Sequence, residues 1–564
     1  MNKFFQSIAD SFRYIPEKNY EFNLSTNDTQ NNDNEITPLE DLNQNIFPSI
    51  DVNLEYIKVK FNSLINSDIK IREFDLNARN KVYRAFIVYI DGMSNSRSIN
   101  RFILHPLMLK SRANTFDKSE EVVSTAVANN ITVRKVKKFN LVDYIYSCLI
   151  PLNDTKKSNR FEEVISAING GDCALFIDTI DTSFILDVKG FDKRAIDKPS
   201  NEVVIRGSQE SFIENIRTNT SMLRRMVNNE NLVIENTSVG TVSKTKCAIC
   251  YIKKIANNDL VSEVKYRINN LDIDYIVSSG QLEQLIKENS KSTLPESIST
   301  ERPDTASAAV LDGKVVVIVN GSPTVLIMPC TFFDLLSSPE DKNLNSTFAN
   351  FLKFLRLLAC FISVLLPGLY IAITNFHEEL IPTELLFSII SSRQAVPISI
   401  ELEIILMEII FELIHEAGIR VPSPIGSTMS IVGALVLGEA AVNANIVSPI
   451  SIIIVAITGL ASFSAPSYSL EFHFRILRFV FIFLGTLFGF LGIALGLFIY
   501  LAILSNYKSF GIPYLSPYVP VINSNNEGFF LSPIWKIERR PDALNTKRKN
   551  KEANISMVWK QGGK

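Results

Sequence analysis

The chain has 564 residues and a net charge of −2 at pH 7, and its mean hydropathy of +0.14 is high for a soluble protein. The near balance of 57 basic and 59 acidic side chains gives no general electrostatic reason to bind nucleic acid. The length suits two to four domains, and the excess hydropathy lies after Lys353. Residues 1–20 hold no apolar run between their charges, so they predict no secretory signal, and we expect the N-terminal region in the cytosol.

The first part of the chain predicts an α/β region preceded by a disordered tether. Residues 1–56 include an Asn-, Asp- and Thr-rich stretch with few apolar positions, typical of a segment without a packed core. Strand-like and helix-like runs then alternate, which favours two α/β sub-domains, 57–195 and 196–346, with a boundary near Lys189–Ser200. The expected strands are Val82–Ile90, Ala174–Ile180, Phe184–Val188, Glu202–Ile205 and Val315–Val319, and the expected helices are Ile99–Leu109, Leu141–Leu149, Phe161–Ile168 and Leu282–Glu288.

Residues able to carry chemistry are sparse in this region. Cys247 and Cys250 have the spacing of half a zinc site or a redox pair, but their surroundings favour a buried strand and no nearby histidine completes a site. The basic run that includes Arg206-Gly207-Ser208 suits a phosphate, yet without a glycine-rich loop a structural salt-bridge network is favoured. Thr300-Glu301-Arg302-Pro303-Asp304 likewise favours a structural turn. Because no catalytic grouping or nucleotide loop appears, the sequence predicts no enzyme, no cofactor and no metal ion.

The segment from Phe351 to Tyr507 is apolar enough for a bilayer, yet it carries ten glutamates and no aspartate. Charged side chains at bilayer depth are costly, so they persist where they face protein or water. We therefore expect a polytopic α-helical membrane domain over 347–510 rather than a plain anchor. The expected segments are Phe354–Phe376 (broken by Pro367-Gly368), Pro397–Ala417, Ile425–Ala441, Ile446–Phe463 and Leu477–Leu504, with Leu380–Ile390 lying flat or dipping into the membrane. Three of the five are expected to cross, and the other two could cross, lie in the interface or re-enter. As one helix, the last segment would be about 42 Å long against a core of roughly 30 Å, so it crosses with tilt.

Basic residues that flank these segments predict the orientation. The tail, 511–564, is basic and is therefore expected in the cytosol, whereas Arg475 and Arg478 before the last segment argue mildly for the opposite side. With both termini inside, the number of crossings is even, which means four or six.

Glu401, Glu408 and Glu412 lie within about 40° of one another around a helix, while Glu403 projects roughly opposite Glu408. A stripe of this kind suits a cation-attracting lining, or a ring of carboxylates if subunits assemble around an axis. It equally suits a helix that lies on the membrane surface with its glutamates in water.

Ser430, Ala434 and Gly438 recur every four residues in an apolar segment, with Glu439 directly after them. Small residues at this spacing let helices approach closely, and they also suit a narrow pore wall. Composition alone favours tight packing slightly over a pore.

Together these residues resemble one family, the A-type subunits of GerA-family spore germinant receptors, over about Ser63 to Pro520. The matching runs are Tyr89-Ile90-Asp91-Gly92, Arg206-Gly207, Glu214-Asn215-Ile216-Arg217-Thr218-Asn219, Leu223-Arg224-Arg225, Thr300-Glu301-Arg302-Pro303-Asp304, Leu366-Pro367-Gly368-Leu369-Tyr370, Phe376-His377-Glu378-Glu379-Leu380-Ile381-Pro382-Thr383, Met407-Glu408-Ile409-Ile410-Phe411-Glu412, Glu416-Ala417-Gly418, Ser430-Ile431-Val432-Gly433-Ala434-Leu435-Val436-Leu437-Gly438 and Ser509-Phe510-Gly511-Ile512-Pro513-Tyr514. The chain departs from the family pattern at Ser208, where proline is usual, at Asn320-Gly321-Ser322-Pro323, and at His415, where arginine is common.

The resemblance implies a multi-pass protein of the inner membrane of the bacterial endospore that works with B-type and C-type receptor subunits. It implies that nutrients bind chiefly the B-type subunit, and that the A-type subunit self-associates, with a pentamer proposed, into a channel for monovalent cations. The expected roles are then helix packing or pore lining for Ser430, Ala434, Gly438 and Glu439, and cation selectivity for Glu401, Glu408 and Glu412. Two alternatives stay open: a scaffold that conducts nothing, and a paralogue that amplifies germination without binding nutrients.

Overall fold

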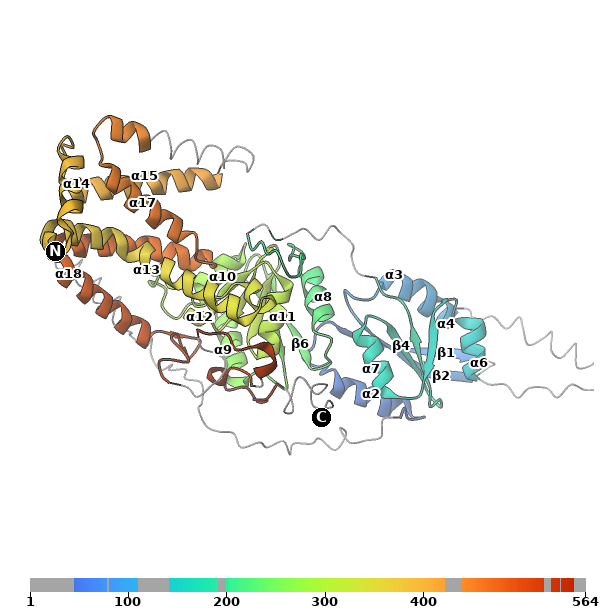
Figure 1. Ribbon diagram of the computed structural model, residues 1–564. Helices are drawn as coiled ribbons and strands as arrows, with labels where there is room; N and C mark the ends of the chain where they lie inside the picture. Colours follow the sequence, from blue (N-terminus) through green and yellow to red (C-terminus); the bar gives the residue numbers. More distant parts are fainter. Residues whose placement is uncertain are drawn as a thin grey trace, which may run out of the picture.

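The computed structural model describes residues 45–78, 81–109, 141–190, 199, 201–420, 438–521, 529–537 and 539–551 (Figure 1). Two α/β sub-domains are followed by a helical region, which confirms the predicted fold class. In Figure 1 the first sub-domain lies at the right in blue and cyan, the second in the centre in green, and the helices at the left.

Sub-domain 1 is a five-stranded antiparallel sheet with helices on both faces. Its elements are α2 (Ile50–Lys60), β1 (Ile69–Ala78), β2 (Lys81–Ile90), α3 (Ser96–Ser98), η1 (Ile99–Leu104), α4 (His105–Leu109), α6 (Leu141–Tyr144), η3 (Ile145–Leu149), β3 (Thr155–Ser158), α7 (Phe161–Asn169), β4 (Cys173–Ile177) and β5 (Ser183–Leu186). The strand order is β1-β2-β4-β5-β3. Phe86 pairs with Phe176 across β2 and β4, and their rings stack with centroids 4.8 Å apart.

The predicted tether is too long, because α2 begins at Ile50. Ile50, Leu54 and Ile57 are buried against the sheet at helical spacing. Apolar residues at these positions outweigh the polar composition around them, so the helix forms inside the range 1–56. The remainder of that range, 1–44, lies outside the described residues.

Sub-domain 2 repeats the same arrangement. Its elements are α8 (Ile216–Met226), β6 (Leu232–Val239), β7 (Thr245–Ile252), α9 (Asn258–Asn269), α10 (Ser279–Ile286), β8 (Ile298–Thr300), α11 (Pro303–Asp312), β9 (Val315–Val319) and β10 (Val325–Met328). The strand order β6-β7-β9-β10-β8 is again antiparallel throughout. The strand predicted at Val315–Val319 is confirmed as β9, fully buried along its length. The strand predicted at Glu202–Ile205 is wrong: the segment is irregular, and Val203 and Ile205 are exposed.

α12 (Phe332–Leu335) and η4 (Pro339–Asn343) lead into α13 (Ser346–Phe376), the first long apolar helix. The predicted break at Pro367-Gly368 is wrong, because α13 continues through Pro367. Proline removes one backbone bond, and a membrane helix tolerates it when a neighbouring group satisfies the freed carbonyl.

The remaining helices are η5 (Glu378–Leu380), α14 (Thr383–Arg393), α15 (Ile400–Arg420), α17 (Pro449–Ser462) and α18 (Tyr468–Asn506). Within the described residues, α13 and α18 are long and apolar enough to cross a membrane, and α17 is a shorter apolar helix. Most of the segment predicted at Ile425–Ala441, namely 421–437, lies outside the described residues.

α18 is not the single tilted helix predicted for Leu477–Leu504. Gly489 has φ 58° and ψ −139°, a non-helical conformation open chiefly to glycine, and the chain folds back there. A Cβ on Gly492 would lie 2.3 Å from the carbonyl oxygen of Leu484, and one on Gly496 would lie 3.2 Å from the Phe481 ring. Such contacts cannot form along a straight helix, where Phe481 and Gly496 would be about 22 Å apart. The two halves therefore form a hairpin.

The C-terminal segment packs on sub-domain 2 instead of forming a separate tail over 511–564. It holds β11 (Lys508–Ser509), β12 (Ile512–Pro513), η6 (Ile534–Lys536) and η7 (Asp542–Leu544). Phe510, Ile512 and Leu544 are buried in the same core cluster as α9 and α10. The basic residues of the tail contribute too, since the Arg540 guanidinium donates to the carbonyl of Leu311 at the end of α11. The predicted domain boundary at 510 therefore divides residues that share one core.

Candidate functional site

The centre of the helical region holds a buried ion pair between α15 and α18. Arg478 and Glu408 are both 0% exposed, and Nη1 of the arginine donates to the carboxylate at 2.6 Å. Arg478 Nε also donates to the carbonyl of Ser363 on α13 at 2.8 Å. That carbonyl lies four residues before Pro367, so the proline leaves it without its helical partner. Arg478 thus completes the hydrogen bonding of α13 and joins three helices.

A second pair lies one turn further along α15. Glu412 accepts from Arg475 of α18 at 2.9 and 3.1 Å, and Arg478 lies 3.9 Å from the same carboxylate. The i, i+4 spacing on α15 and the i, i+3 spacing on α18 place these four side chains on facing sides of the two helices. Beyond them, His415 Nε2 lies 3.9 Å from Glu471 Oε1, and neither atom has a hydrogen-bond partner within the described residues.

Glu401 and Glu403 face other neighbours. Glu401 is hydrogen-bonded by the side chain of Asn375, near the end of α13. Glu403 is fully buried, accepts from the backbone N–H of Ser448 and lies 3.5 Å from Arg393. Glu403 and Glu408 thus have separate partners, Ser448 and Arg393 for the first and Arg478 for the second. The structure therefore brings Glu408 and Glu412 together with arginines, while Glu401 lies about 10 Å along the helix from Glu408.

The surface-helix interpretation, with every glutamate in water, does not describe Glu403 or Glu408, since both are buried. An isolated buried carboxylate is costly, and here arginines offset that cost. In the sequence, Arg475 and Arg478 serve only to predict the orientation in the membrane. Their spacing of three residues in an apolar segment was the available signal that they pair with the glutamates.

The prediction of close helix approach at Ser430, Ala434 and Gly438 can be compared with the structure only at Gly438. Ser430 and Ala434 lie outside the described residues. Gly438 is buried, but a Cβ there would lie an ordinary 3.9 Å from Ile452, and Glu439 is exposed. The contacts of Gly438 within the described residues therefore do not require glycine.

Close helix approach occurs instead at glycines outside the predicted small-residue segment. A Cβ on Gly368 would lie 2.6 Å from the carbonyl oxygen of Phe481, and one on Gly485 would lie 2.6 Å from that of Gly368. A Cβ on Gly459 would overlap the Phe411 ring at 2.3 Å. The signal was present as G-x-x-x-G at Gly485 and Gly489.

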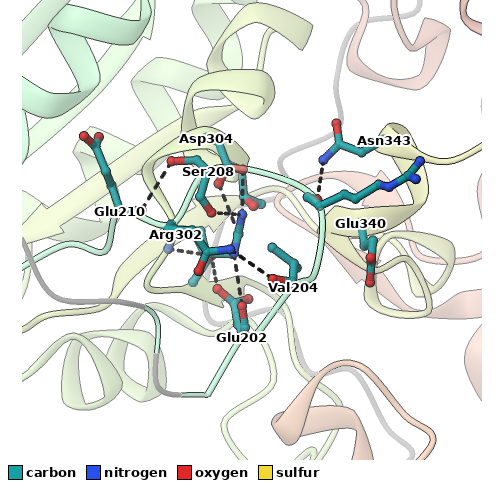
Figure 2. Close-up of polar contacts among 12 residues, drawn as sticks. Glu202, Val204, Ser208, Glu210, Arg302, Asp304, Glu340 and Asn343 are labelled. Carbon is teal, nitrogen blue, oxygen red and sulfur yellow. Dashed lines mark hydrogen bonds and ion pairs between the residues drawn. The ribbon is translucent and has the colours of Figure 1, made fainter.

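In sub-domain 2, the conspicuous polar motifs are structural. Figure 2 shows Arg302 enclosed by Glu202, Ser208 and Asp304. Its guanidinium donates to the carbonyls of Glu202 and Ser208 at 3.1 and 2.8 Å and to Asp304 at 2.8 Å. Burial raises the pKa of Glu202, against the lowering effect of the bonds from Thr300 and Glu301. The segment is not a turn, since Thr300 ends β8 and Pro303 begins α11, but the contacts of the buried Arg302 agree with the structural interpretation.

The C-x-x-C pair lies on β7, as the strand interpretation predicted, with both thiols buried. Burial raises the pKa of Cys247 to about 12, so its thiol is protonated and unreactive near neutral pH. Within the described ranges, no group of three or more His, Cys, Asp or Glu side chains is placed to hold a metal ion.

Comparison with known proteins gives the family. The model described as Bacillus/Clostridium GerA spore germination protein matches residues 55–543. Spore germination protein KA of Bacillus subtilis is 35% identical over 89% of this chain and 88% of its own length. GerLA of Bacillus cereus is 35% identical over 85% and 93%, and the uncharacterized membrane protein YfkQ of Bacillus subtilis is 36% identical over 90% and 93%.

The crystal structure of the N-terminal domain of the A subunit of the Bacillus megaterium spore germinant receptor GerK3 is also similar. It is 28% identical, covers 51% of this chain and 97% of that chain, and superposes with a TM-score of 0.36. On the strength of the family match over most of its length, the chain belongs to the GerA family of spore germination proteins.

Proposed function

We propose that this chain is the A-type subunit of a nutrient-sensing spore germination receptor and forms, by self-association, a channel for monovalent cations. It works with B-type and C-type subunits in the inner membrane of the endospore, and nutrient binding to a partner opens it. Family membership and relatives named as spore germination proteins support the receptor role.

The observation that carries the channel proposal is the buried charge cluster of Glu408, Glu412, Arg475 and Arg478. Ionisable residues among membrane helices are rare, and by default they indicate a functional site such as an ion pathway. In the conformation described here the two arginines neutralise both carboxylates, which opposes the passage of cations and suits a closed state. Opening would then separate the arginines from the glutamates, and Glu401, Glu408 and Glu412 would select cations. A nutrient on a partner subunit shifts this equilibrium only by binding the open state more tightly.

The direction of the helices supports a multi-pass topology with both termini in the cytosol. α13 starts beside sub-domain 2, and α18 ends beside it, where Tyr514 and Leu335 share a core cluster with Leu470 and Leu504 (Figure 1). Because the chain leaves and returns on one side, the number of crossings is even. The hairpin at Gly489 adds one crossing to the five segments predicted from sequence, which favours six over four.

The test is cation flux from liposomes that hold the full chain together with its B-type and C-type partners, with amino acids added as the nutrient. Glu408→Gln should lower cation selectivity, and Glu384→Gln, at an exposed position on α14, is the matched control. Since Glu408→Gln leaves Arg478 buried without its counter-charge, the double variant Glu408→Gln/Arg478→Gln keeps the site neutral if the single variant fails to fold. Unchanged selectivity in both variants would refute the role of Glu408.

The close-approach positions have their own test. Ser430, Ala434, Gly438 and Glu439 are proposed to pack between subunits or to line the pore. Gly438→Leu should then impair assembly or ion release, and a variant with both intact counts against this helix.

A non-conducting scaffold is the second candidate, because Glu408 and Glu412 each already have an arginine partner. The scaffold predicts no flux from liposomes under any condition. The third, a germination-amplifying paralogue, is separated by neighbouring genes: B-type and C-type genes favour the receptor, and a dipicolinate-transport operon favours the paralogue.

A further inference from the structure

The start of α13 and the segment 529–536, far apart in sequence, lie side by side where sub-domain 2 meets the helices. Asn350 of α13 donates to the Leu531 carbonyl at 3.1 Å and accepts from the Leu531 N–H at 2.6 Å. The segment is also hydrogen-bonded to Tyr518, whose hydroxyl accepts from the Phe529 N–H at 3.0 Å. These contacts fix the position of the segment on the protein surface.

Large apolar side chains project outward from both elements. We name them the junction patch, which consists of Phe348, Phe351, Leu355 and Leu358 of α13 with Phe530, Ile534 and Trp535 of the segment. Each is between 45% and 64% exposed. The four positions on α13 follow i, i+3, i+7 and i+10, so they form one continuous stripe along the helix. An exposed apolar patch of this kind marks a contact with another surface.

The position of the patch identifies a bilayer surface as that partner. No charged residue follows Arg356 in α13, and residues 357–376 would span about 30 Å, the thickness of a hydrocarbon core. Asn350 then lies about 10 Å below the hydrocarbon edge, near the outer limit of the headgroup layer. The stripe of the patch therefore continues, without interruption, from the membrane-spanning part of α13 to that depth.

The chemistry of the segment agrees with its position. Tryptophan is enriched at headgroup depth because its ring is apolar and its N–H is polar. Lys536 follows Trp535 directly and Arg539 lies four residues after it; both are exposed and suit anionic lipid headgroups. A second copy of the chain would not need these two basic residues.

We infer that the junction patch inserts into the headgroup layer of an anionic bilayer, so that the C-terminal segment is a membrane-surface anchor in addition to the membrane-spanning helices. This places the membrane-proximal side of sub-domain 2 directly on the lipid. It does not depend on whether the protein conducts ions.

The experiment uses the only two tryptophans of the chain, Trp535 and Trp559. In the full-length Trp559→Phe variant, reconstituted in nanodiscs of phosphatidylcholine and phosphatidylglycerol, Trp535 is the only indole. Lipid that carries a nitroxide on its headgroup should remove most of the Trp535 emission, and aqueous iodide should have little effect. The matched control carries Trp535→Phe, Trp559→Phe and Tyr146→Trp, which places the indole at an exposed site in sub-domain 1.

Two outcomes would overturn the inference. If iodide quenches Trp535 as strongly as the control and the headgroup-labelled lipid does not, the patch faces water. If Trp535 is shielded from both quenchers, another protein surface covers the patch, and a second copy becomes its occupant. The control should respond to iodide alone in every case, which verifies that quenching by the lipid requires an indole at the bilayer.

Discussion

The two α/β sub-domains share the same element order and the same strand order, but different parts of the chain pack against their sheets. α2 and α7 cover one face of the first sheet, and α8 and α11 cover the matching face of the second. On the opposite face, sub-domain 1 holds helices from its own sequence, whereas sub-domain 2 also buries Phe510, Ile512 and Leu544 from the C-terminal segment. The same fold thus serves once as a peripheral unit and once as the support of the helical region.

The two joints differ in chemistry as well. Sub-domains 1 and 2 meet through polar groups: Arg224 of α8 pairs with Asp68 at 2.8 Å, and the Ser67 N–H donates to the Ile234 carbonyl on the edge strand β6. Sub-domain 2 meets the helices through an apolar cluster that includes Leu335, Leu336 and Tyr514. Small polar joints between domains permit relative motion, and apolar ones resist it. We therefore expect sub-domain 2 to move with the helices and sub-domain 1 to move relative to both.

The largest expected effect is that of Phe510→Ala. The ring is 1% exposed in the core beneath α9 and α10 and lies 4.3 Å from the Arg267 guanidinium, so its loss should destabilise sub-domain 2 by about 4 kcal/mol. Hydrogen exchange should rise in β9 while β4 keeps its protection. Phe176→Ala, in the core of sub-domain 1, is the matched control and should give the reverse pattern. Equal loss in both sheets after Phe510→Ala would mean that the sub-domains unfold as one unit.

Arg224→Met should weaken the polar joint by about 3 kcal/mol, because it leaves Asp68 buried without a counter-charge. Faster hydrogen exchange at residues 66–68 should report the loss, with the β9 core little changed. The double variant Arg224→Met/Asp68→Leu removes both charges and should recover most of the protection. If the double variant is as impaired as the single one, the contact depends on the hydrogen bonds that Arg224 donates to Asn66 and to the Leu232 carbonyl, and not on its charge.

Asp334 links sub-domain 2 to α12 and makes stability depend on pH. Burial alone would raise the pKa of Asp334, but Lys314 at 2.7 Å and the bonds from Thr331 lower it below its ordinary value of 3.8. Because the folded pKa is depressed, the contribution is complete above the unfolded pKa and is lost as pH falls through the folded value. Asp334→Asn should cost about 1.5 kcal/mol near neutral pH. Thermal unfolding between about pH 6 and pH 3 should then show a smaller acid-induced loss than in the parent chain.

The control for this prediction is Lys314→Gln in the Asp334→Asn background. If the added substitution costs as much as Lys314→Gln alone, the two groups act independently, and the pH dependence arises elsewhere in the chain.

Sequence patterns predicted those elements whose residues are uniform in character. The run Val315–Val319 is buried on both faces and was found as a strand. β1 was not found, because Lys70, Arg72 and Glu73 interrupt its apolar positions on an edge strand with one exposed side. The repeat of the whole sub-domain was also missed, since strand order depends on pairing between distant residues and leaves no periodic trace in composition.

The candidate site, too, could be predicted from the sequence only in part. The angles between Glu403, Glu408 and Glu412 follow from helix geometry, since α15 is helical over Ile400–Arg420. The partners of these glutamates cannot be predicted in that way. Glu408 and Arg478 are separated by 70 residues, and their meeting depends on the crossing of α13, α15 and α18. The hairpin at Gly489 escaped prediction because apolar residues surround it on both sides, so hydropathy shows one continuous segment.

The smallest predicted effect compares two corresponding helix starts. Asn215 caps α8 by accepting a hydrogen bond from the Arg217 N–H at 2.9 Å, whereas Ser49, the N-cap of α2, makes no such side-chain bond. Asn215→Ala should therefore cost about 1 kcal/mol, and Ser49→Ala should cost only a few tenths. Chemical denaturation of the full chain, with hydrogen exchange to assign the loss to α8 or α2, measures the difference. Equal losses of stability in the two variants would contradict this prediction. They would mean that the hydrogen bond accepted by Asn215 stabilises α8 no more than water stabilises the start of α2.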